Sequence, residues 1–99
     1  MSDAGWHVYI VRCADDSLYT GVAIDVARRV QEHNESPKAA KYTRARRPVE
    51  LVYSESVPDR ATAMKREYAI KQLSVAEKQR LLETVDQASI SGMSLLSSR

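Results

Sequence analysis

The sequence between His7 and His33 reads HVYIVRCADDSLYTGVAIDVARRVQEH. Two β-prone runs, each carrying a tyrosine, flank a short acidic turn, and this pattern predicts a hairpin. The aspartates of that turn tolerate the left-handed backbone conformation that tight turns require. A helical pattern follows from Asp25, whose carboxylate is suited to cap the first turn. The segment therefore predicts a strand, a turn, a strand and a helix.

Alternation along the first strand, expected over about Trp6–Cys13, places Tyr9 on the same face as His7. His7 either supports Tyr9 or packs in the core. In the second strand, Tyr19 and Gly21 share a face. Gly21 has two interpretations: it marks a bulge or a strand end, or its missing Cβ lets a substrate or the first tyrosine approach the backbone closely.

The sequence after His33 predicts one more strand and two more helices. Residues 36–48 contain two prolines around a basic stretch and are interpreted as a long loop or a short broken helix. Apolar and polar residues alternate over 49–55, which predicts a strand. Asp59 is placed to cap a helix over 60–73, and a capping-box pattern, SVAE, begins another helix at Ser74.

This order predicts an α/β (α+β) domain over residues 6–85, with a small three-stranded, mainly antiparallel sheet flanked by helices. The serine-rich residues 86–99 are interpreted as a flexible C-terminal tail. Cys13 is the only cysteine, which excludes an intrachain disulfide and indicates a small buried side chain. No apolar run is long enough to span a membrane and no signal core is visible, so we expect a cytoplasmic protein.

Charge is distributed unevenly, although the net charge of the whole chain is only +2. Residues 1–27 carry a net charge of −3, whereas residues 28–47 hold seven basic and two acidic residues, a net charge of +5. A basic block directly after the tyrosine strands suits a phosphate backbone, and the alternative is a solvated surface. The residues that we expect to bind nucleic acid are Lys41, Tyr42, Arg44, Arg46 and Arg47. Within this set the tyrosine could stack on a base or sugar, or close the loop over the sheet.

Five short blocks resemble one family, in the same order along the chain. Val8-Tyr9-Ile10 and Tyr19-Thr20-Gly21 resemble the paired tripeptides that name the GIY-YIG nucleases. Asp25–Arg29, followed by His33, resembles the helix that carries the catalytic arginine of that family. AKYTR at 40–44 and MKREYAIK at 64–71 are similar to later blocks of its small single-domain bacterial (YhbQ-like) members. The resemblance implies the GIY-YIG fold and endonuclease activity.

The resemblance also implies catalytic roles for four side chains. The hydroxyls of Tyr9 and Tyr19 would face the cleft, with Tyr19 favoured to deprotonate or position the attacking water. Arg29, the second arginine of its pair, would stabilise the transition state, which suits a planar and permanently charged donor. His33, one helical turn later, could hold the water or a phosphate oxygen. Without the resemblance, strand tyrosines are more often packing residues.

Glu67 is the candidate metal ligand, at the edge of the inward face of the helix expected over 60–73. An unpaired carboxylate at such a place is costly, so it needs a partner. That partner is either a nearby cation such as Arg29, or Mg²⁺ (or Mn²⁺) bound together with water and a substrate phosphate. A single carboxylate predicts weak metal binding without substrate. Some nucleases of the family have a later asparagine near the site, which the segment after Leu73 lacks.

These observations predict a metal-dependent endonuclease, a hydrolase that cleaves phosphodiester bonds in DNA and that we expect to be monomeric. Two alternatives stay open. One is a nucleic-acid binding module with little cleavage, and the other is a subunit that depends on a protein partner for substrate choice. The joint presence of Tyr9, Tyr19, Arg29 and Glu67 favours the enzyme, because a binding module needs no such set.

Overall fold

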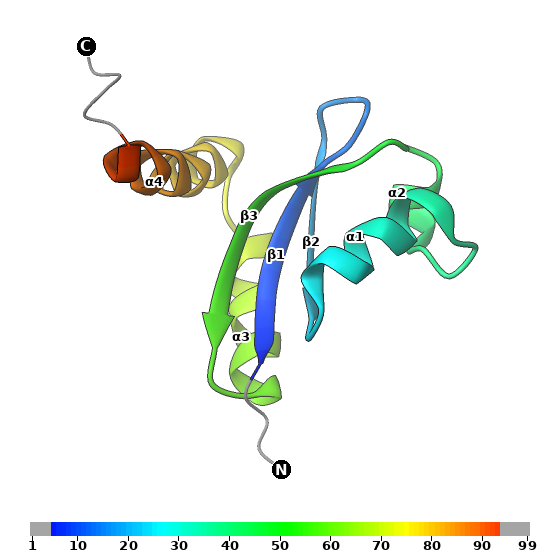
Figure 1. The fold of residues 1–99 in the computed structure, drawn as a ribbon, viewed down its shortest axis with the longest axis horizontal. Coiled ribbons are helices and arrows are strands. Elements are labelled where there is room, and N and C mark those ends of the chain that lie inside the picture. The colour runs from blue at the N-terminus through cyan, green and yellow to red at the C-terminus, as the bar shows by residue number, and fades with distance from the viewer. Residues whose placement is uncertain (1–4, 94–99) are drawn as a thin grey trace.

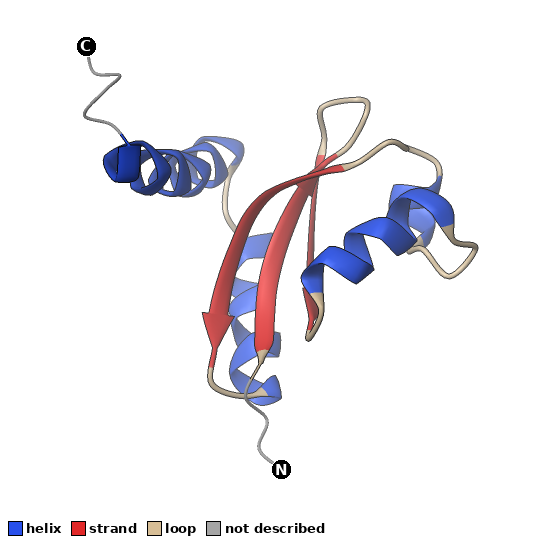
Figure 2. Ribbon diagram, in the orientation of Figure 1, coloured by secondary structure: helices blue, strands red, loops and turns tan. Residues whose placement is uncertain are grey.

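The computed structural model describes residues 5–93, and their side chains as far as Thr84. Three antiparallel strands form one sheet in the order β2-β1-β3, and helices cover both of its faces (Figures 1 and 2). This confirms the predicted α+β fold class. In chain order, the elements are β1 (Trp6–Arg12), β2 (Leu18–Ala23), α1 (Val26–Glu35), α2 (Lys41–Arg44), β3 (Glu50–Val57), α3 (Arg60–Lys71) and α4 (Val75–Met93).

The central strand β1 is buried on both faces and divides the core into two clusters. On one face, Val8 and Ile10 pack with Ala63 and Ile70 of α3 and with Leu82 of α4. On the other face, toward α1, the cluster consists of Tyr9, Val11, Cys13 and Val49, with Tyr19, Ala23, Val26 and Val30 packed against it. Because the side chains of β1 are divided between these two clusters, a site on one face can use only the side chains that point to that face.

The predicted turn and helix starts are present, and each rests on a local hydrogen bond. Asp16 in the β1–β2 turn has a φ of 69°, the left-handed conformation expected there. The Asp25 carboxylate accepts from the Arg28 amide at 3.0 Å to cap α1, and the Asp59 carboxylate caps α3 through the Thr62 amide at 2.7 Å. Such caps contribute about 1 kcal/mol each.

The capping box before α4 is also formed in both directions. The Ser74 amide donates to Glu77 Oε1 at 2.8 Å, and the Glu77 amide donates to Ser74 Oγ at 3.1 Å. Val75, in the first turn of this helix, is 76% exposed although it is apolar. None of the helices in residues 5–93 is long and apolar enough to cross a membrane.

Three features differ in extent from the sequence-based expectations. Residues 36–48 contain one short helix, α2, at Lys41–Arg44. The register of β1 against β3 shifts between Ile10 and Val11, which breaks the expected alternation and leaves Leu51 41% exposed. Helix α4 continues to Met93, eight residues past the expected start of the tail at Asp86, because serines lower helix propensity without ending a helix as proline does. Residues 94–99 of the expected tail lie outside the described residues.

Gly21 is required by the packing of Tyr9, its partner across the β1–β2 ladder. A Cβ at Gly21 would lie 2.6 Å from the Tyr9 hydroxyl oxygen and 2.7 Å from Cζ. The ladder between β1 and β2 runs without a bulge, so of the two interpretations of Gly21 the close approach of the first tyrosine is the one observed. The missing side chain leaves room for the phenol ring to lie across β2.

We expect Gly21→Ala to destabilise the fold, although alanine suits a strand better than glycine does. The Tyr9 ring is 1% exposed and hydrogen bonded, so it cannot move aside without loss, and overpacking of this kind costs about 1–3 kcal/mol. Urea denaturation of the wild type and the variant measures the change. In a Tyr9→Ala background the same substitution should cost little, since the ring that the new Cβ would meet is absent. An equal cost in both backgrounds would place the strain in the backbone.

Candidate active site

Three of the expected side chains, from three elements, meet on the face of the sheet toward α1. The ring of His33 in α1 lies with its centroid 5.9 Å from that of Tyr9 in β1 and 5.3 Å from that of Tyr19 in β2. Tyr9 and His33 are almost completely buried, whereas Tyr19 is half-buried. The hairpin supplies the two phenols, and α1, which begins at the Asp25 cap, supplies the histidine. This cluster is the centre of the candidate site.

A chain of hydrogen bonds fixes the protonation of the buried pair. Tyr9 Oη lies 2.7 Å from His33 Nε2, and His33 Nδ1 lies 2.7 Å from Thr43 Oγ1. The Thr43 hydroxyl donates its proton to the Ala40 carbonyl at 3.0 Å, so its oxygen accepts from His33 Nδ1–H. A neutral imidazole has one N–H, and Nε2 therefore accepts the proton of Tyr9. The phenol is left with its lone pairs directed away from the histidine.

The ionisation of these groups agrees with that arrangement. Burial, with a contribution from the Arg29 and Arg47 cations, lowers the pKa of His33 from 6.5 to about 4. Burial and the neighbouring Tyr19 raise the pKa of Tyr9 to about 12, against the opposing effect of Arg29. Near neutral pH the histidine is thus neutral and the phenol is protonated, as the hydrogen-bond directions require.

The position of His33 differs from the expected contact with an attacking water. Its ring has no exposed surface, and both of its nitrogens are engaged by protein hydroxyls. Thr43, which holds the far side of the ring, was not expected at the site. Its sequence signals are a hydroxyl in a loop and a place in the AKYTR block at 40–44, and neither reveals burial.

The two adjacent arginines of α1 lie in different environments. The Arg29 side chain is 29% exposed, and its Nη1 donates to Glu32 Oε1 at 2.8 Å and to the Lys38 carbonyl at 3.3 Å. The Arg28 side chain is 74% exposed, with its Nε 3.6 Å from the second oxygen of Glu32. Only Arg29 acts on the buried pair, because its charge lowers the pKa values of both Tyr9 and His33.

Glu67 lies near the same cluster and is paired with a cation other than Arg29. Its Oε2 is 3.4 Å from Lys71 Nζ, one turn along α3, and its side chain is 18% exposed. Its negative charge contributes to the raised pKa of Tyr9. Lys71 Nζ also lies 6.0 Å from the centre of the Tyr19 ring, so α3 closes the site at the edge of β2.

The acidic groups near the site suit a hard cation only in part. Within the described part of the chain, no cluster of three or more histidine, cysteine or acidic side chains is close enough to hold a metal. A divalent cation at Glu67 would therefore complete its coordination with water and substrate oxygens, as Mg²⁺ commonly does.

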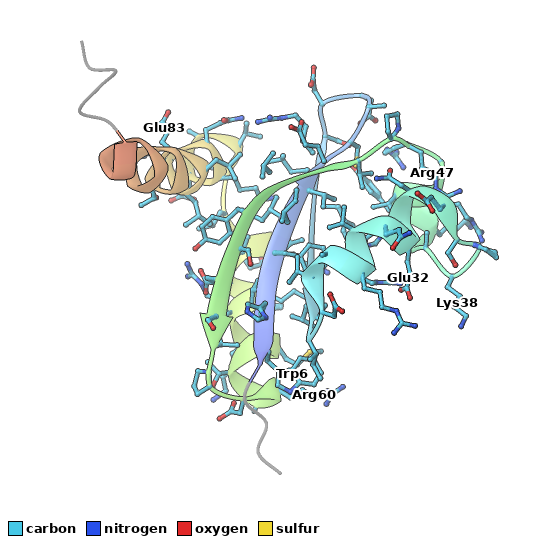
Figure 3. The ribbon with its side chains drawn as sticks, in the orientation of Figure 1. Trp6, Glu32, Lys38, Arg47, Arg60 and Glu83 are labelled. Carbon is cyan, nitrogen blue, oxygen red and sulfur yellow. The ribbon has the colours of Figure 1, made fainter. Side chains whose placement is uncertain are left out.

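The basic residues after α1 divide into structural and available groups. Arg47 donates to the carbonyls of His33, Ser36 and Glu32, which are the last acceptors of α1, so its guanidinium is committed to the fold. Figure 3 places Glu32, Lys38 and Arg47 around this end of α1. Arg46 is also engaged, by Asp15 at 3.0 Å. Of the five residues expected to bind nucleic acid, these two arginines are thus held inside the fold.

The remaining basic side chains near the site face solvent without a carboxylate partner in the described residues. Lys38 and Lys41 are exposed, and Arg44 is exposed with one bond to the Pro37 carbonyl at 3.1 Å. Tyr42 is 37% exposed, between Arg46 and Tyr19. The buried Nδ1 of His7 has no hydrogen-bond partner among the residues that the structure describes.

Comparison with known sequences identifies the family and its relatives. Residues 5–80 match the family described as GIY-YIG catalytic domain. A UPF0213 protein of Desulfotalea psychrophila is 60% identical over 78 residues, which span 79% of this chain and 71% of that protein. A UPF0213 protein of Halobacterium salinarum is 53% identical over 75 residues, which span 76% of this chain and 96% of that protein.

Two solution structures determined by NMR are also similar. The UPF0213 protein of Bacillus halodurans is 44% identical with a TM-score of 0.53, over 80% of this chain and 83% of that one. A protein from E. faecalis is 34% identical with a TM-score of 0.56, over 88% of this chain and 93% of that one. The sheet with flanking helices is therefore common to these relatives.

We expect the burial of His33 to make stability depend on pH. Because the pKa of His33 falls from 6.5 to about 4 on folding, the unfolded chain binds a proton between these values that the folded chain does not. Stability should therefore fall as the pH is lowered from about 6.5 toward about 4. Urea midpoints at a series of pH values measure this dependence.

The matched variant is His33→Gln, which keeps polar atoms at the position but does not titrate in this range. Its stability should change less than that of the wild type between pH 6.5 and 5. Parallel curves for the two proteins would show that other groups cause the dependence.

Proposed function

The chain belongs to the GIY-YIG catalytic domain family, and on that premise we propose that it is a metal-dependent endonuclease that hydrolyses phosphodiester bonds in DNA. The observation that carries the proposal is the oriented cluster of Tyr9, Tyr19, Arg29 and His33, with Glu67 beside it. A module that only binds DNA gains nothing from a buried phenol whose proton is directed to a neutral histidine, because phosphate binding needs only accessible cations.

In this proposal Tyr19 is the phenol that touches the attacking water, since it is half-buried whereas Tyr9 is 1% exposed. Tyr9 acts beside it. Because the proton of Tyr9 is directed to His33 Nε2, its oxygen presents lone pairs to the site and can accept hydrogen bonds from water or from Arg29. His33 then serves as a positioning residue that fixes Tyr9 rather than as a ligand for water.

Arg29 is proposed to bind the phosphate that is attacked. Its bonds to Glu32 and to the Lys38 carbonyl both use Nη1, so the donors at Nε and Nη2 remain for Tyr9 and for phosphate oxygens. These contacts also hold the guanidinium in place before substrate arrives. A fixed cation of this kind stabilises the negative charge that grows on the phosphorus oxygens in the transition state.

Glu67 would hold the cation, Mg²⁺ or Mn²⁺, which when bound supplies charge stabilisation at the leaving oxygen. The carboxylate must first give up its contact with Lys71. Partly exposed ion pairs one helical turn apart contribute only about 0.3–0.5 kcal/mol, so this exchange costs little. Without its pairing to Glu67, Lys71 would remain close to Tyr19, where its ammonium can contact a phosphate of the substrate.

The DNA backbone is proposed to lie along residues 36–47, which hold five basic and no acidic residues. Because Arg46 and Arg47 are engaged within the fold, the contacts fall to Lys38, Lys41 and Arg44. Lysine and arginine contacts of this type bind phosphates without reading the base sequence. Substrate choice would then follow the shape of the DNA, or a protein partner.

We expect Arg29→Ala to slow cleavage by about a hundredfold or more, the usual effect of removing a transition-state donor. Arg28→Ala, which removes the same charge from the adjacent position, should change the rate only a few-fold because its side chain faces solvent. The measurement is single-turnover cleavage of labelled branched, nicked, single-stranded and duplex DNAs with Mg²⁺ or Mn²⁺. Equal losses for the two variants would indicate general electrostatics.

A Glu67→Gln variant separates catalysis from binding in the same assay. The amide keeps the shape of the side chain and removes the charge that a divalent cation needs. Cleavage should disappear while DNA binding and the melting temperature change little. Undiminished cleavage would remove Glu67 from the site, and a wild type that binds but never cleaves these DNAs would favour a binding module.

We expect the Lys41→Ala/Arg44→Ala double variant to bind every DNA sequence more weakly by a similar factor. Two lost phosphate contacts should reduce the slope of log affinity against log salt by about 2, because fewer counterions are released. Fluorescence anisotropy at several salt concentrations measures the slope. A Lys78→Ala/Arg80→Ala variant removes the same charge from α4, on the other side of the sheet from α2 (Figure 1), and should leave the slope unchanged. Equal slopes for both double variants would show that only net charge matters.

A further inference from the structure

Tyr42, from the short helix α2, packs on the site from the loop side. Its ring stacks on that of Tyr19, with centroids 5.9 Å apart and planes at 23°. The guanidinium carbon of Arg46 lies 3.8 Å from the centre of the same ring. A planar cation that close occupies one face of Tyr42, and Tyr19 packs against the same ring. Tyr42 is 37% exposed, so these two neighbours hold the ring without burying it.

Arg46 is held in this position by hydrogen bonds as well as by the ring. Its Nε donates to Asp15 Oδ2 and its Nη1 to the Tyr42 carbonyl, both at 3.0 Å. Its own carbonyl accepts from the Ala14 amide at 2.9 Å. Hydrogen bonds from Ser17, together with Arg46, keep the pKa of Asp15 below its usual value, so the carboxylate is charged. The β1–β2 turn thus anchors the cation that covers Tyr42.

Tyr19 depends on packing for its position. Among residues 5–84, whose side chains are described, no hydrogen bond to its hydroxyl is recorded. Its ring meets His33 edge-on at 5.3 Å and Tyr42 by stacking, with Lys71 Nζ 6.0 Å away. Removal of the stacked partner would open one side of the ring and allow it to turn, which would carry the hydroxyl away from Tyr9.

We propose that Tyr42 and Arg46 are positioning residues for Tyr19. The column Asp15–Arg46–Tyr42 holds the Tyr19 ring against His33, so that the Tyr19 hydroxyl stays beside Tyr9. The catalytic consequence rests on the proposed nuclease function, whereas the effect on Tyr19 does not. This assignment differs from the expectation that Tyr42 and Arg46 bind nucleic acid, because Arg46 already lies over the Tyr42 ring and is paired with Asp15.

The test compares Tyr42→Phe, which keeps the stacked ring, with Tyr42→Leu, which keeps an apolar side chain but removes the ring. NMR of the protein without DNA reports the nuclear Overhauser effects between the ring protons of Tyr19 and His33, which measure where the Tyr19 ring lies whichever residue stands at position 42. These effects should weaken in the leucine variant and keep close to their wild-type strength in the phenylalanine variant. Unchanged effects in the leucine variant would overturn the proposal whether or not the protein cleaves DNA.

The cleavage arm measures the single-turnover rate at saturating DNA, and DNA affinity separately. Tyr42→Leu should lower the rate by about tenfold or more, since small misplacements of a reacting group can cost up to about a hundredfold, and should leave affinity nearly unchanged. Tyr42→Phe should restore the rate. Weaker binding with an unchanged saturating rate would instead identify Tyr42 as a base-stacking residue. If the wild type cleaves no DNA tested, the proposed function fails and the NMR comparison alone decides the positioning role.

Asp15→Asn gives a second test that leaves every aromatic ring in place. In this variant DNA affinity should rise while the cleavage rate falls. Loss of a negative charge near the basic block should tighten DNA binding slightly. Because Asp15 anchors Arg46, the positioning role nevertheless predicts a slower saturating rate and weaker Overhauser effects between Tyr19 and His33. Tighter binding with no change in the rate or in these effects would overturn the role of the column.

Discussion

The site depends on one hydrogen bond that solvent does not reach, between the Tyr9 hydroxyl and His33 Nε2. It joins the central strand to α1 and requires three further conditions. Position 21 must lack a side chain so that the phenol can cross β2. The histidine must stay neutral, and Thr43 of α2 must accept the hydrogen bond from its Nδ1–H. A buried polar group left without its partner costs about 1–3 kcal/mol, so these conditions support one another.

Local features of this fold could be predicted because their physics involves residues close in sequence. The carboxylates of Asp25 and Asp59 cap helices three residues away, and the capping box at Ser74 works over the same distance. The two tyrosine strands were equally clear, because alternation along a strand determines the face that each side chain takes. Sequence spacing also placed Arg29 and His33 on one face of α1, and the resemblance to the GIY-YIG nucleases implied that this face meets the tyrosines.

Contacts between distant segments could not be predicted in the same way. Nothing near Thr43 in the sequence indicates that it reaches His33, and the bulge that exposes Leu51 arises only where β3 meets β1. Glu67 pairs with Lys71 rather than with Arg29 because α3 approaches the site from the β2 edge. The sequence predicts that the basic block forms one surface. Tertiary contacts divide it into residues that stabilise the fold and residues that face solvent.

The commitment of Arg47 to the end of α1 has an electrostatic consequence. Aligned peptide dipoles give a helix C-terminus about half a negative charge, which would repel a polyanion. Here the guanidinium sits on the last carbonyls of α1, beside the segment that carries Lys38 and Lys41. The charge of Arg47 therefore offsets the partial negative charge of this helix end. An arginine that never touches a phosphate can in this way determine how closely an anionic strand approaches.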